Sequence, residues 1–470
     1  MTLLFYPRGG SAQVAGYLAM SLQRHGIDVR LACGSLGSPG DLGHAGTFFP
    51  ELDPLVYSYD AAVAAWERGE DPMDAPQPMH PSFEVRSGVP DRAFTLVSPE
   101  QGDHLAHAWA QLLASDEQFM RSDVLHLHHM TPIHDAVATL GLEAPIVTHL
   151  HGTDLKMLEA IETGRLPEHA RHYADHWRER LRNAAHSSSA LIVISPHDRD
   201  EAAALVGVPD ERVHWIPNGV DTTRFSPQRL SNKERRSLWK QWLVDDPQGW
   251  DEASQQPGSI RYNEAVLERF IDPDSDEHNP VLLFVGRFIE FKRVPMLIRA
   301  YAAAREHFTT PAPLVIWGGS PGEWEGEHPH TVAQQVGDSD IFFAGWRGHA
   351  DLPTGLAASD VLVAPSFNES FGQVYIEAMA CGLPVIATAS GGPLSFVNVD
   401  AAAPDGWMIA VDDQDALTRA LIDAVNEPTQ RAAFGSNGVR HATERFSWDS
   451  LATQFQDLYA DVTSTTTRVS

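Results

Sequence analysis

Two series of alternating strand and helix patterns, separated by a polar stretch, most strongly constrain how this chain can fold. In each series, short runs rich in Val, Ile and Leu are followed by helical patterns, as is typical of a parallel sheet covered on both faces. The first series opens with TLLFYP and RGGSAQ, and the second opens with PVLLFVG at residues 280–286. Ligands of open parallel sheets bind beyond the carboxyl ends of the strands. We therefore predict an α/β fold of two doubly wound, Rossmann-like domains facing a cleft.

The predicted domain boundaries lie where the composition changes. Residues 1–225 form the first domain, and residues 280–445 form the second. Between them, residues 226–279 are polar and rich in Pro, Gly and acidic residues, which indicates an interdomain connection with one or two inserted helices. Residues 446–470 are expected to form a C-terminal helix that packs back towards the first domain and frays after residue 462.

The strongly acidic composition argues against two classes of partner. The 470 residues carry a net charge of -29, which repels nucleic acid and anionic lipid. One basic stretch, residues 171–182, is interpreted as a solvated helix face with Asp175 and Glu179 as partners, the alternative being a docking surface for an anionic acceptor or a membrane. Two cysteines, no basic leader and no long apolar run predict a reduced, cytoplasmic protein without stable membrane insertion.

The stretch NESFGQVYIEAMACGLPV places Glu369 and Glu377 beside a predicted helix that Ser370 would cap. That helix would begin just beyond a strand, and its free N–H groups at Phe371 and Gly372 would favour an anion. Carboxylates accept hydrogen bonds from hydroxyls, so a phosphate flanked by two sugars would fit both features. The pattern alone leaves an alternative open, in which Glu369 stabilises the helix dipole and Glu377 is a surface residue.

The same stretch resembles the signature of retaining glycosyltransferase family 4, also called glycosyl transferases group 1, which has the GT-B fold. That signature has two glutamates separated by seven residues, followed by Ala-Met-Ala-Cys-Gly-x-Pro-Val. The resemblance continues through ATASGGP (residues 387–393) and PNGVD (217–221), and covers the chain from Gly9 to about Tyr459. The chain departs from the family at Ser395, where a glutamate is common, so any role of that carboxylate is lost.

The resemblance implies transfer of a glycosyl group, with retention, from a UDP- or GDP-linked sugar to a small or lipid-linked hydroxylated acceptor. It assigns the hexose hydroxyls to Glu369 and the ribose to Glu377. It places the acceptor on the first domain, where residues 51–101 are the expected source of specificity. We expect a front-face reaction in which the leaving phosphate takes the acceptor's proton and domain closure excludes water. The oligomeric state stays open.

Two cations follow the first strand of the second series. Arg287 and Lys292 lie in VGRFIEFKR, and lysine is rare in this chain. Positive charge at a strand's carboxyl end suits a diphosphate leaving group, whose negative charge grows as its bond to the sugar breaks. The family has the same Arg-x4-Lys pair at this place. We predict that both residues bind the diphosphate and assist catalysis.

Two further segments resemble parts of the family's donor site. Gly9 and Gly10 form the turn after the first strand, where the family has a glycine-rich loop over the donor phosphates. Trp346 and Arg347 lie in a segment that borders the base pocket, where contacts from the backbone are an equally good alternative.

Histidines cluster in HLHH (residues 126–129) and at His149 and His151. A metal site is the superficial interpretation, but neighbouring strand residues point to opposite faces, so we expect that these imidazoles do not all converge on one ion. The family's His-Gly-x-Asp motif resembles residues 151–154. It implies that His151 contacts the transferred sugar and that Asp154 orients sugar or acceptor.

No essential metal is predicted. The Asp-x-Asp pairs Asp272–Asp274 and Asp413–Asp415 are interpreted as solvated loops, because neither follows a strand. Two alternatives to the transferase remain: a nucleotide-sugar epimerase of the same fold, and a catalytically silent nucleotide-sugar-binding protein. Incubation with donor alone, which only an epimerase would convert, discriminates between them.

Overall fold

The computed structural model describes residues 1–7, 9–84, 88–271, 278–337, 339–400 and 402–469. The chain divides into two compact units. Met1–Gly219 and Trp448–Ser470 form the first unit, and Val220–Ser447 form the second.

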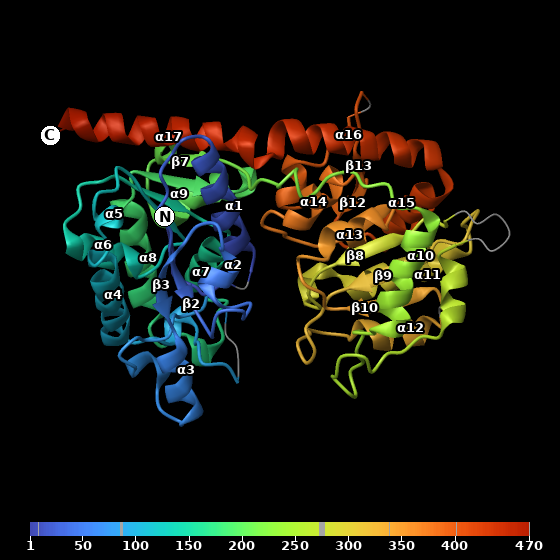
Figure 1. Ribbon diagram of the computed structural model, residues 1–470, viewed down its shortest axis with the longest axis horizontal. Coiled ribbons are helices and arrows are strands. Elements are labelled where there is room, and N and C mark those ends of the chain that lie inside the picture. Colours follow the sequence, from blue (N-terminus) through green and yellow to red (C-terminus); the bar gives the residue numbers. More distant parts are fainter. Residues whose placement is uncertain (8, 85–87, 272–277, 338, 401, 470) are drawn as a thin grey trace. The chain divides into compact units, whose positions relative to one another are not determined.

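The first unit is built on a seven-stranded parallel sheet in the order β3-β2-β1-β4-β5-β6-β7 (Figure 1). This order confirms the predicted doubly wound arrangement, because the chain crosses over between β1 and β4. The strands are β1 (Thr2–Leu3), β2 (Ala32–Ser35), β3 (Leu55–Ser58), β4 (Leu125–His128), β5 (Ile146–His149), β6 (Ala190–Val193) and β7 (Val213–Trp215).

Helices cover both faces of this sheet. They are α1 (Gly10–Arg24), α2 (Ala45–Phe48), α3 (Asp60–Glu67), η1 (Pro72–Asp74), η2 (Phe94–Leu96), α4 (Pro99–Ala114), α5 (Glu117–Met120), α6 (Ile133–Leu140), α7 (Thr153–Glu162), η3 (Glu168–Ala170), α8 (Ala174–Ser187), α9 (Pro196–Val206), η4 (Asp210–Arg212) and α17 (Trp448–Val469).

The alternation of strand side chains divides the core of the first unit into two layers. Leu3 and Val147 pack with α1 and with Phe455 of α17, whereas Leu4 and Leu127 face Trp109 and the other helices. Since His126 alternates with Leu127, its ring lies on the α17 side, near Phe455. In place of the expected fraying, α17 continues to Val469, and the Thr463 hydroxyl donates a hydrogen bond to the carbonyl of Tyr459 (2.8 Å).

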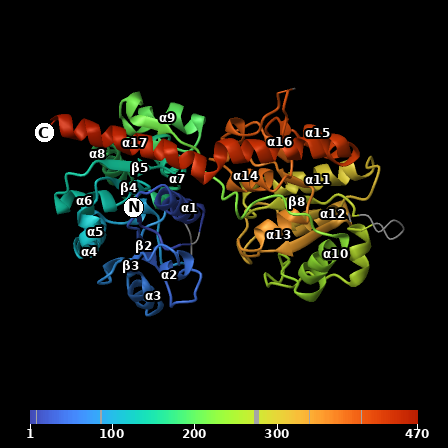
Figure 2. The same cartoon turned by 45° about the horizontal axis from the view of Figure 1, so that its top comes forward.

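The second unit contains a six-stranded parallel sheet in the order β10-β9-β8-β11-β12-β13. Its helices also occupy both faces: α11, α12 and α15 supply residues to one core layer, and α14 packs against α16 (Figure 2). The strands are β8 (Leu282–Val285), β9 (Leu314–Trp317), β10 (Ile341–Gly345), β11 (Val361–Ala364), β12 (Val385–Thr388) and β13 (Gly406–Ile409). The helices are α10 (Asn232–Lys240), η5 (Gln241–Asp245), η6 (Glu264–Arg269), η7 (Glu290–Lys292), α11 (Val294–Arg305), α12 (Pro329–Val336), α13 (Leu352–Ala357), α14 (Gln373–Ala380), η8 (Gly392–Ser395), α15 (Gln414–Asn426) and α16 (Pro428–Phe446).

The segment expected as an interdomain connection lies within the second unit wherever it is described. It contains α10, η5 and η6, and its tryptophans Trp239, Trp242 and Trp250 are buried. The Trp250 indole N–H donates a hydrogen bond to the carbonyl of Gly319 (2.8 Å). These large apolar side chains attach the polar segment to the second sheet.

Among the described residues, no helix combines the length and apolar character needed to cross a membrane. Cys33 and Cys381 are both buried free thiols.

Candidate functional site

The crossover of the second sheet brings two predicted site segments together. Strands β8 and β11 are neighbours, so the loops that follow them leave the same edge of the sheet. Arg287 and Lys292 lie in the first loop, and Glu369 lies in the second. The backbone N–H of Phe367 donates a hydrogen bond to the carbonyl of Phe291 (2.8 Å), which connects the two loops directly.

Lys292 and Glu369 form an ion pair between Nζ and Oε2. Each side chain is only 14 % exposed, so the pair is sheltered without being sealed from solvent. The Lys292 ammonium also lies 5.2 Å from the centre of the Phe291 ring. Arg287 is exposed at the end of β8. Two of the predicted catalytic residues therefore meet, although neither the spacing nor the motif indicated that they would pair.

The start of α14 differs from the prediction. The helix begins at Gln373 with Gly372 as its N-cap, so the expected cap at Ser370 is wrong. The reason is the φ of 92° at Gly372, a conformation that glycine adopts readily and other residues rarely. Phe371, just before this turn, is buried against Phe396, with ring centres 5.3 Å apart.

A glycine turn supports the backbone of Glu369. The N–H of Gly392 donates to the carbonyl of Glu369 (2.8 Å), and a Cβ on Gly391 would lie 2.1 Å from that same oxygen. The turn after β12 therefore presses directly on the Glu369 loop. Ser395 donates its hydroxyl proton to the carbonyl of Gly392 (2.6 Å), so the serine that departs from the family pattern closes the turn instead.

We expect Gly391→Ala to destabilise the second unit by about 2–4 kcal/mol, of which backbone strain contributes about 1 kcal/mol and the clash the rest. Gly326→Ala is the matched control, because Gly326 has nearly the same φ (67° against 64°) but nothing within 4 Å of its Cβ position. Denaturant unfolding of both variants measures the difference. Equal losses would contradict the close approach to Glu369.

Glu377 is buried on α14, with 3 % of its surface exposed. Its Oε1 lies 3.0 Å from Nε2 of His349, whose ring packs near Phe225 (5.5 Å between centres). The alternative of a surface glutamate is therefore wrong. Sequence reasoning missed His349, and the available signal was its place in FAGWRGHADLP, the segment expected to border the base.

Trp346 and Arg347 follow β10 but differ in their surroundings. Trp346 is 51 % exposed. The Arg347 guanidinium donates to the carbonyls of Trp242 (3.0 Å) and Asp246 (2.6 Å) and pairs with the Asp246 carboxylate (3.2 Å). Arg347 thus holds the end of η5 with its side chain, which favours the alternative that this segment contacts a ligand through its backbone.

In the first unit, Gly9 and Gly10 lie at the start of α1, after β1. Gly9 is extended (φ -156°), Gly10 is the first helical residue, and a Cβ at either position would meet nothing within 4 Å. Neither the backbone nor the packing of the described residues requires glycine here. Gly9 is the N-cap of α1, a position where glycine is common, and the open space at both positions leaves room for a ligand to approach the backbone.

Asp154 connects the ends of β4 and β5. Its Oδ1 accepts the N–H of Met130 (2.9 Å), and its Oδ2 accepts the N–H of His151 (3.2 Å) and contacts Nδ1 of His129 (2.9 Å). Burial opposes ionisation of this carboxyl, but His129 and the two N–H groups outweigh it and hold the pKa of Asp154 below its usual value. Gly152 has a φ of 84°. The folded structure therefore explains why Gly152 and Asp154 occur in the His-Gly-x-Asp motif, but it does not explain why a histidine occurs at position 151.

His151 is half-buried, and its Nε2 lies 2.9 Å from Nδ1 of His128. Burial, together with His129 and His126, lowers the pKa of His151 well below its usual value. The ring is therefore neutral at physiological pH and can donate one hydrogen bond and accept another.

The expectation that the histidines do not all converge agrees with the described residues, but three of them, His126, His128 and His149, lie together. His126 and His128 share one face of β4, and the parallel register pairs His128 with His149 of β5. Side chains alternate between the two faces within each strand, as expected. The register between β4 and β5 then brings His149 next to the two histidines of β4. Of the two acidic pairs, Asp272–Asp274 lies outside the described residues. Asp413 caps α15 through the N–H of Ala416 (2.7 Å).

The basic stretch around α8 is largely neutralised by carboxylates of its own unit. Arg178 pairs with Asp175 (3.0 Å), Arg182 with Glu162 (2.9 Å), and Arg180 with Asp103 and Asp135 (3.1 and 2.8 Å). These ion pairs favour the interpretation as a helix face over that of an anion-docking surface.

Comparisons with known proteins agree with this geometry. The model of Glycosyltransferase Family 4 matches residues 8–224, and that of Glycosyl transferases group 1 matches residues 268–441. D-inositol 3-phosphate glycosyltransferase 2 of Catenulispora acidiphila is 27 % identical over 437 residues, 90 % of each chain.

Two solved structures share the fold. Sucrose-phosphate synthase from Thermosynechococcus elongatus has a TM-score of 0.62 and 20 % identity, over 97 % of this chain and 94 % of the other. HepE from Anabaena, in complex with UDP and glucose, has a TM-score of 0.61 and 19 % identity, over 98 % of each chain.

Proposed function

The chain belongs to the family 4, group 1 glycosyltransferases, enzymes of the GT-B fold, and from this we propose that it moves a hexose, with retention, from a UDP- or GDP-linked donor to a hydroxylated acceptor. The Lys292–Glu369 pair at the crossover of the second sheet carries this proposal. One member suits phosphate and the other suits hydroxyls, and both occur at the place where open parallel sheets bind ligands.

The pair leaves capacity on both side chains. An ammonium has three N–H donors and a carboxylate has about four acceptor sites, so one mutual bond leaves most of them for the donor. Lys292 binds the diphosphate and Glu369 accepts hydrogen bonds from the hexose hydroxyls. Arg287, exposed at the end of β8, adds the second positive charge.

Glu377 binds the ribose through its second oxygen, because His349 holds the first. A carboxylate fixed by a buried partner keeps its orientation when the nucleotide is absent. The half-exposed Trp346 offers a flat apolar surface to the base, while Arg347 keeps the neighbouring backbone in place.

In the first unit, Gly9 and Gly10 admit the donor phosphates, and His151 donates a hydrogen bond to the transferred sugar. Asp154 positions the loop that carries His151. The anomeric carbon loses its bond to the diphosphate and gains one to the acceptor oxygen on the same face, and the acceptor's proton passes to the leaving phosphate. Lys292 and Arg287 stabilise the departing charge, so no metal ion is required at the phosphates.

The names and bound ligands of similar proteins suggest which donor and acceptor to test first. HepE was solved with UDP and glucose, which makes UDP-glucose the first donor to test. A relative is named for action on D-inositol 3-phosphate, so a phosphorylated polyol is the first acceptor to test. Lipid-linked hydroxylated acceptors follow, since residues 51–101, the expected source of acceptor specificity, carry no recognisable signature.

The test combines a thermal-shift screen of nucleotide sugars with NMR analysis of the product. We expect one α-linked donor to raise the Tm and to yield an α-linked product at the same rate with and without EDTA. A β-linked product would overturn retention. A rate that is lost in EDTA while the Tm is unchanged, and that magnesium or manganese restores, would overturn metal independence at the phosphates. Conversion of donor alone would identify an epimerase, and binding without turnover on every acceptor would indicate a silent binding protein.

A further inference from the structure

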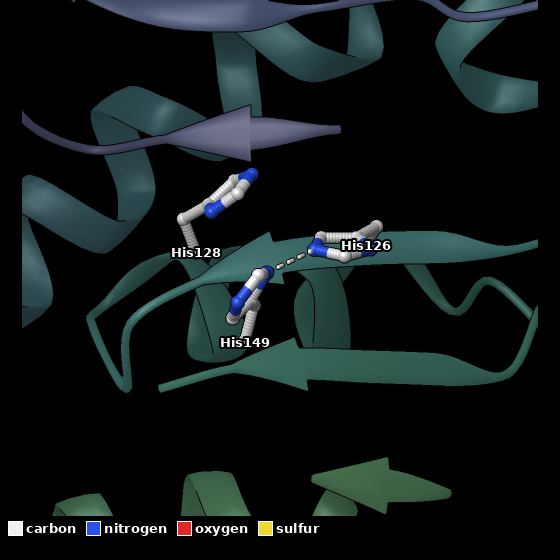
Figure 3. Close-up of side chains that lie close together, drawn as sticks. All are labelled: His126, His128 and His149. Atoms are coloured by element: carbon white, nitrogen blue, oxygen red, sulfur yellow. Dashed lines mark hydrogen bonds between the residues drawn. The ribbon is translucent and has the colours of Figure 1, made fainter. Parts of the chain in front are cut away.

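Three histidines of the first unit gather beneath α17, where the proposed reaction uses none of them. His126 and His128 project from β4 and His149 projects from β5 onto the same side of the sheet (Figure 3). All three are almost completely buried, with exposed fractions of 2 %, 0 % and 0 %. A core layer otherwise filled by Leu, Ile, Val and Phe has no packing reason for three imidazoles at one point.

The ring nitrogens lie close enough for a small adjustment of the rings to bring them onto one metal ion. One nitrogen from each ring can be chosen so that all three lie within 4.8 Å of one another. Nε2 of His126 and Nδ1 of His149 are 3.3 Å apart, as the dashed line in Figure 3 marks. Two nitrogens bound tetrahedrally at 2.0–2.1 Å from zinc are also separated by about 3.3 Å. The same distance is long for a hydrogen bond between nitrogens.

One of the rings has a nitrogen on the cluster side without a partner. Nε2 of His128 has no hydrogen-bond partner among the described residues. A buried polar atom without a partner is costly, and such atoms in native proteins often indicate an ion or water that completes the site.

In two of the rings, the nitrogen that faces away from the cluster makes a contact of the kind that orients histidine ligands in metal centres. Nδ1 of His126 lies 2.6 Å from the hydroxyl of Tyr459, and Nδ1 of His128 lies 2.9 Å from Nε2 of His151. Histidine ligands commonly use the second ring nitrogen for such a bond, which fixes the tautomer and orients the ring. Tyr459 belongs to α17, so the cluster also connects the C-terminal helix to the sheet.

A cavity of about 680 Å³ leads to this cluster within the first unit. His126 and Tyr459 line it, together with the acidic side chains of Asp28, Glu117 and Asp123. Arg30 and Arg121 line it as well, so its charge is mixed. The cavity reaches the cluster at its His126 and Tyr459 end, and His128 and His149 are not among its lining residues.

We propose that His126, His128 and His149 bind one divalent transition-metal ion, zinc in the first instance, that fastens α17 and the centre of the first sheet to one another. Three imidazoles suit zinc, cobalt or nickel and disfavour magnesium and calcium, which prefer oxygen ligands. With three protein ligands, water takes the fourth position of zinc. None of the three residues was assigned to donor or acceptor, but His128 contacts His151 (2.9 Å), which the proposed function places at the transferred sugar, so metal binding is tested by readouts other than transfer.

The first experiment measures metal content and metal-dependent stability of the full-length chain without an affinity tag. We expect about one zinc ion per chain after dialysis against a weak chelator. In protein stripped with a strong chelator, zinc at 100-fold above its Kd should raise the Tm of the first unit by about 5–10 °C. Cobalt should produce the visible absorption of a tetrahedral nitrogen site. Stripped wild type that gains neither Tm nor absorption with zinc, cobalt or nickel would overturn the proposal.

Variants identify the ligands. His149→Gln should weaken cobalt binding at least about 100-fold, since even loss of an outer partner costs 10–100-fold. Tyr459→Phe, which keeps all three ligands, should weaken it by about 10–100-fold. His134→Gln is the control, because His134 is equally buried but bonded to Thr148 (2.8 Å) outside the cluster, and it should bind cobalt as wild type does.

Binding unchanged in His149→Gln would place any bound metal on other residues and overturn the assignment. If that variant fails to fold, Tyr459→Phe and the wild-type cobalt spectrum decide between a metal centre and a merely hydrogen-bonded histidine cluster.

Discussion

Replacing Lys292 with alanine is expected to lower kcat/KM for sugar transfer at least about 100-fold, because removal of one preorganised donor to a developing charge typically costs that much. The second unit should also lose about 1–3 kcal/mol of stability, because the Glu369 carboxylate, only 14 % exposed, is left without its charged partner. Steady-state rates with the donor found by screening, together with thermal unfolding of each variant, measure both effects.

A second substitution separates two explanations of that loss. If Lys292 acts only by positioning Glu369, then Glu369→Gln and the double variant should each lower kcat/KM for transfer by about the same factor as Lys292→Ala. If the lysine contacts the diphosphate and the glutamate contacts the hexose, the two losses multiply to about 10⁴-fold. We expect the multiplied loss, because each side chain keeps free hydrogen-bonding positions beyond the mutual bond.

Lys240→Ala is the matched control for these variants. Lys240 also pairs with a glutamate of the second unit, Glu264 (2.8 Å), but both side chains are well exposed. Its removal should leave transfer within about two-fold of wild type, as is usual for a surface ion pair. Near wild-type rates in both Lys292→Ala and Glu369→Gln would place the donor site elsewhere.

The sequence predicted the fold well where strands are continuous apolar runs. PVLLFVG corresponds to β8, one of the strands that carry the site. Strands β3 and β13 were missed because their sequences, LVYS and GWMI, are only partly buried and form no continuous run of Val, Ile and Leu. The polar composition of residues 226–279 concealed three buried tryptophans, since an average over a segment does not register a few large anchoring side chains.

Residues of the candidate site could be proposed from the sequence where a single motif contains them. Contacts between segments far apart in the sequence could not. Arg287, Lys292, Glu369 and Glu377 follow from local spacing and from the family resemblance. The Lys292–Glu369 pair spans 77 positions, and His349 reaches Glu377 across 28. The histidine cluster depends on the register between β4 and β5, which no pattern within one strand determines.

Replacing Asp154 with alanine is expected to destabilise the first unit by about 3–5 kcal/mol, the cost of removing one partner from a buried charged network. The change would leave the N–H groups of Met130 and His151 without their acceptor and remove the contact to His129, in a place where Asp154 is 0 % exposed. His129 also has a φ of 67°, which costs about 1 kcal/mol and persists only while its surroundings hold it. For a domain of this size the Tm should fall by about 6–20 °C.

Two further substitutions, Asp154→Asn and Asp135→Ala, test the physical reason for this loss of stability. Asp154→Asn keeps the shape but turns an N–H towards the donor of His151, so it should restore only part of the stability. Asp135→Ala removes a carboxylate of the same unit that is 46 % exposed and paired with Arg180, and it should cost no more than about 1 kcal/mol. Asp154→Ala with a Tm equal to that of Asp135→Ala would contradict the role of Asp154 as the acceptor that joins β4 to β5. A normal Tm combined with lost transfer would instead assign the carboxylate to the substrate.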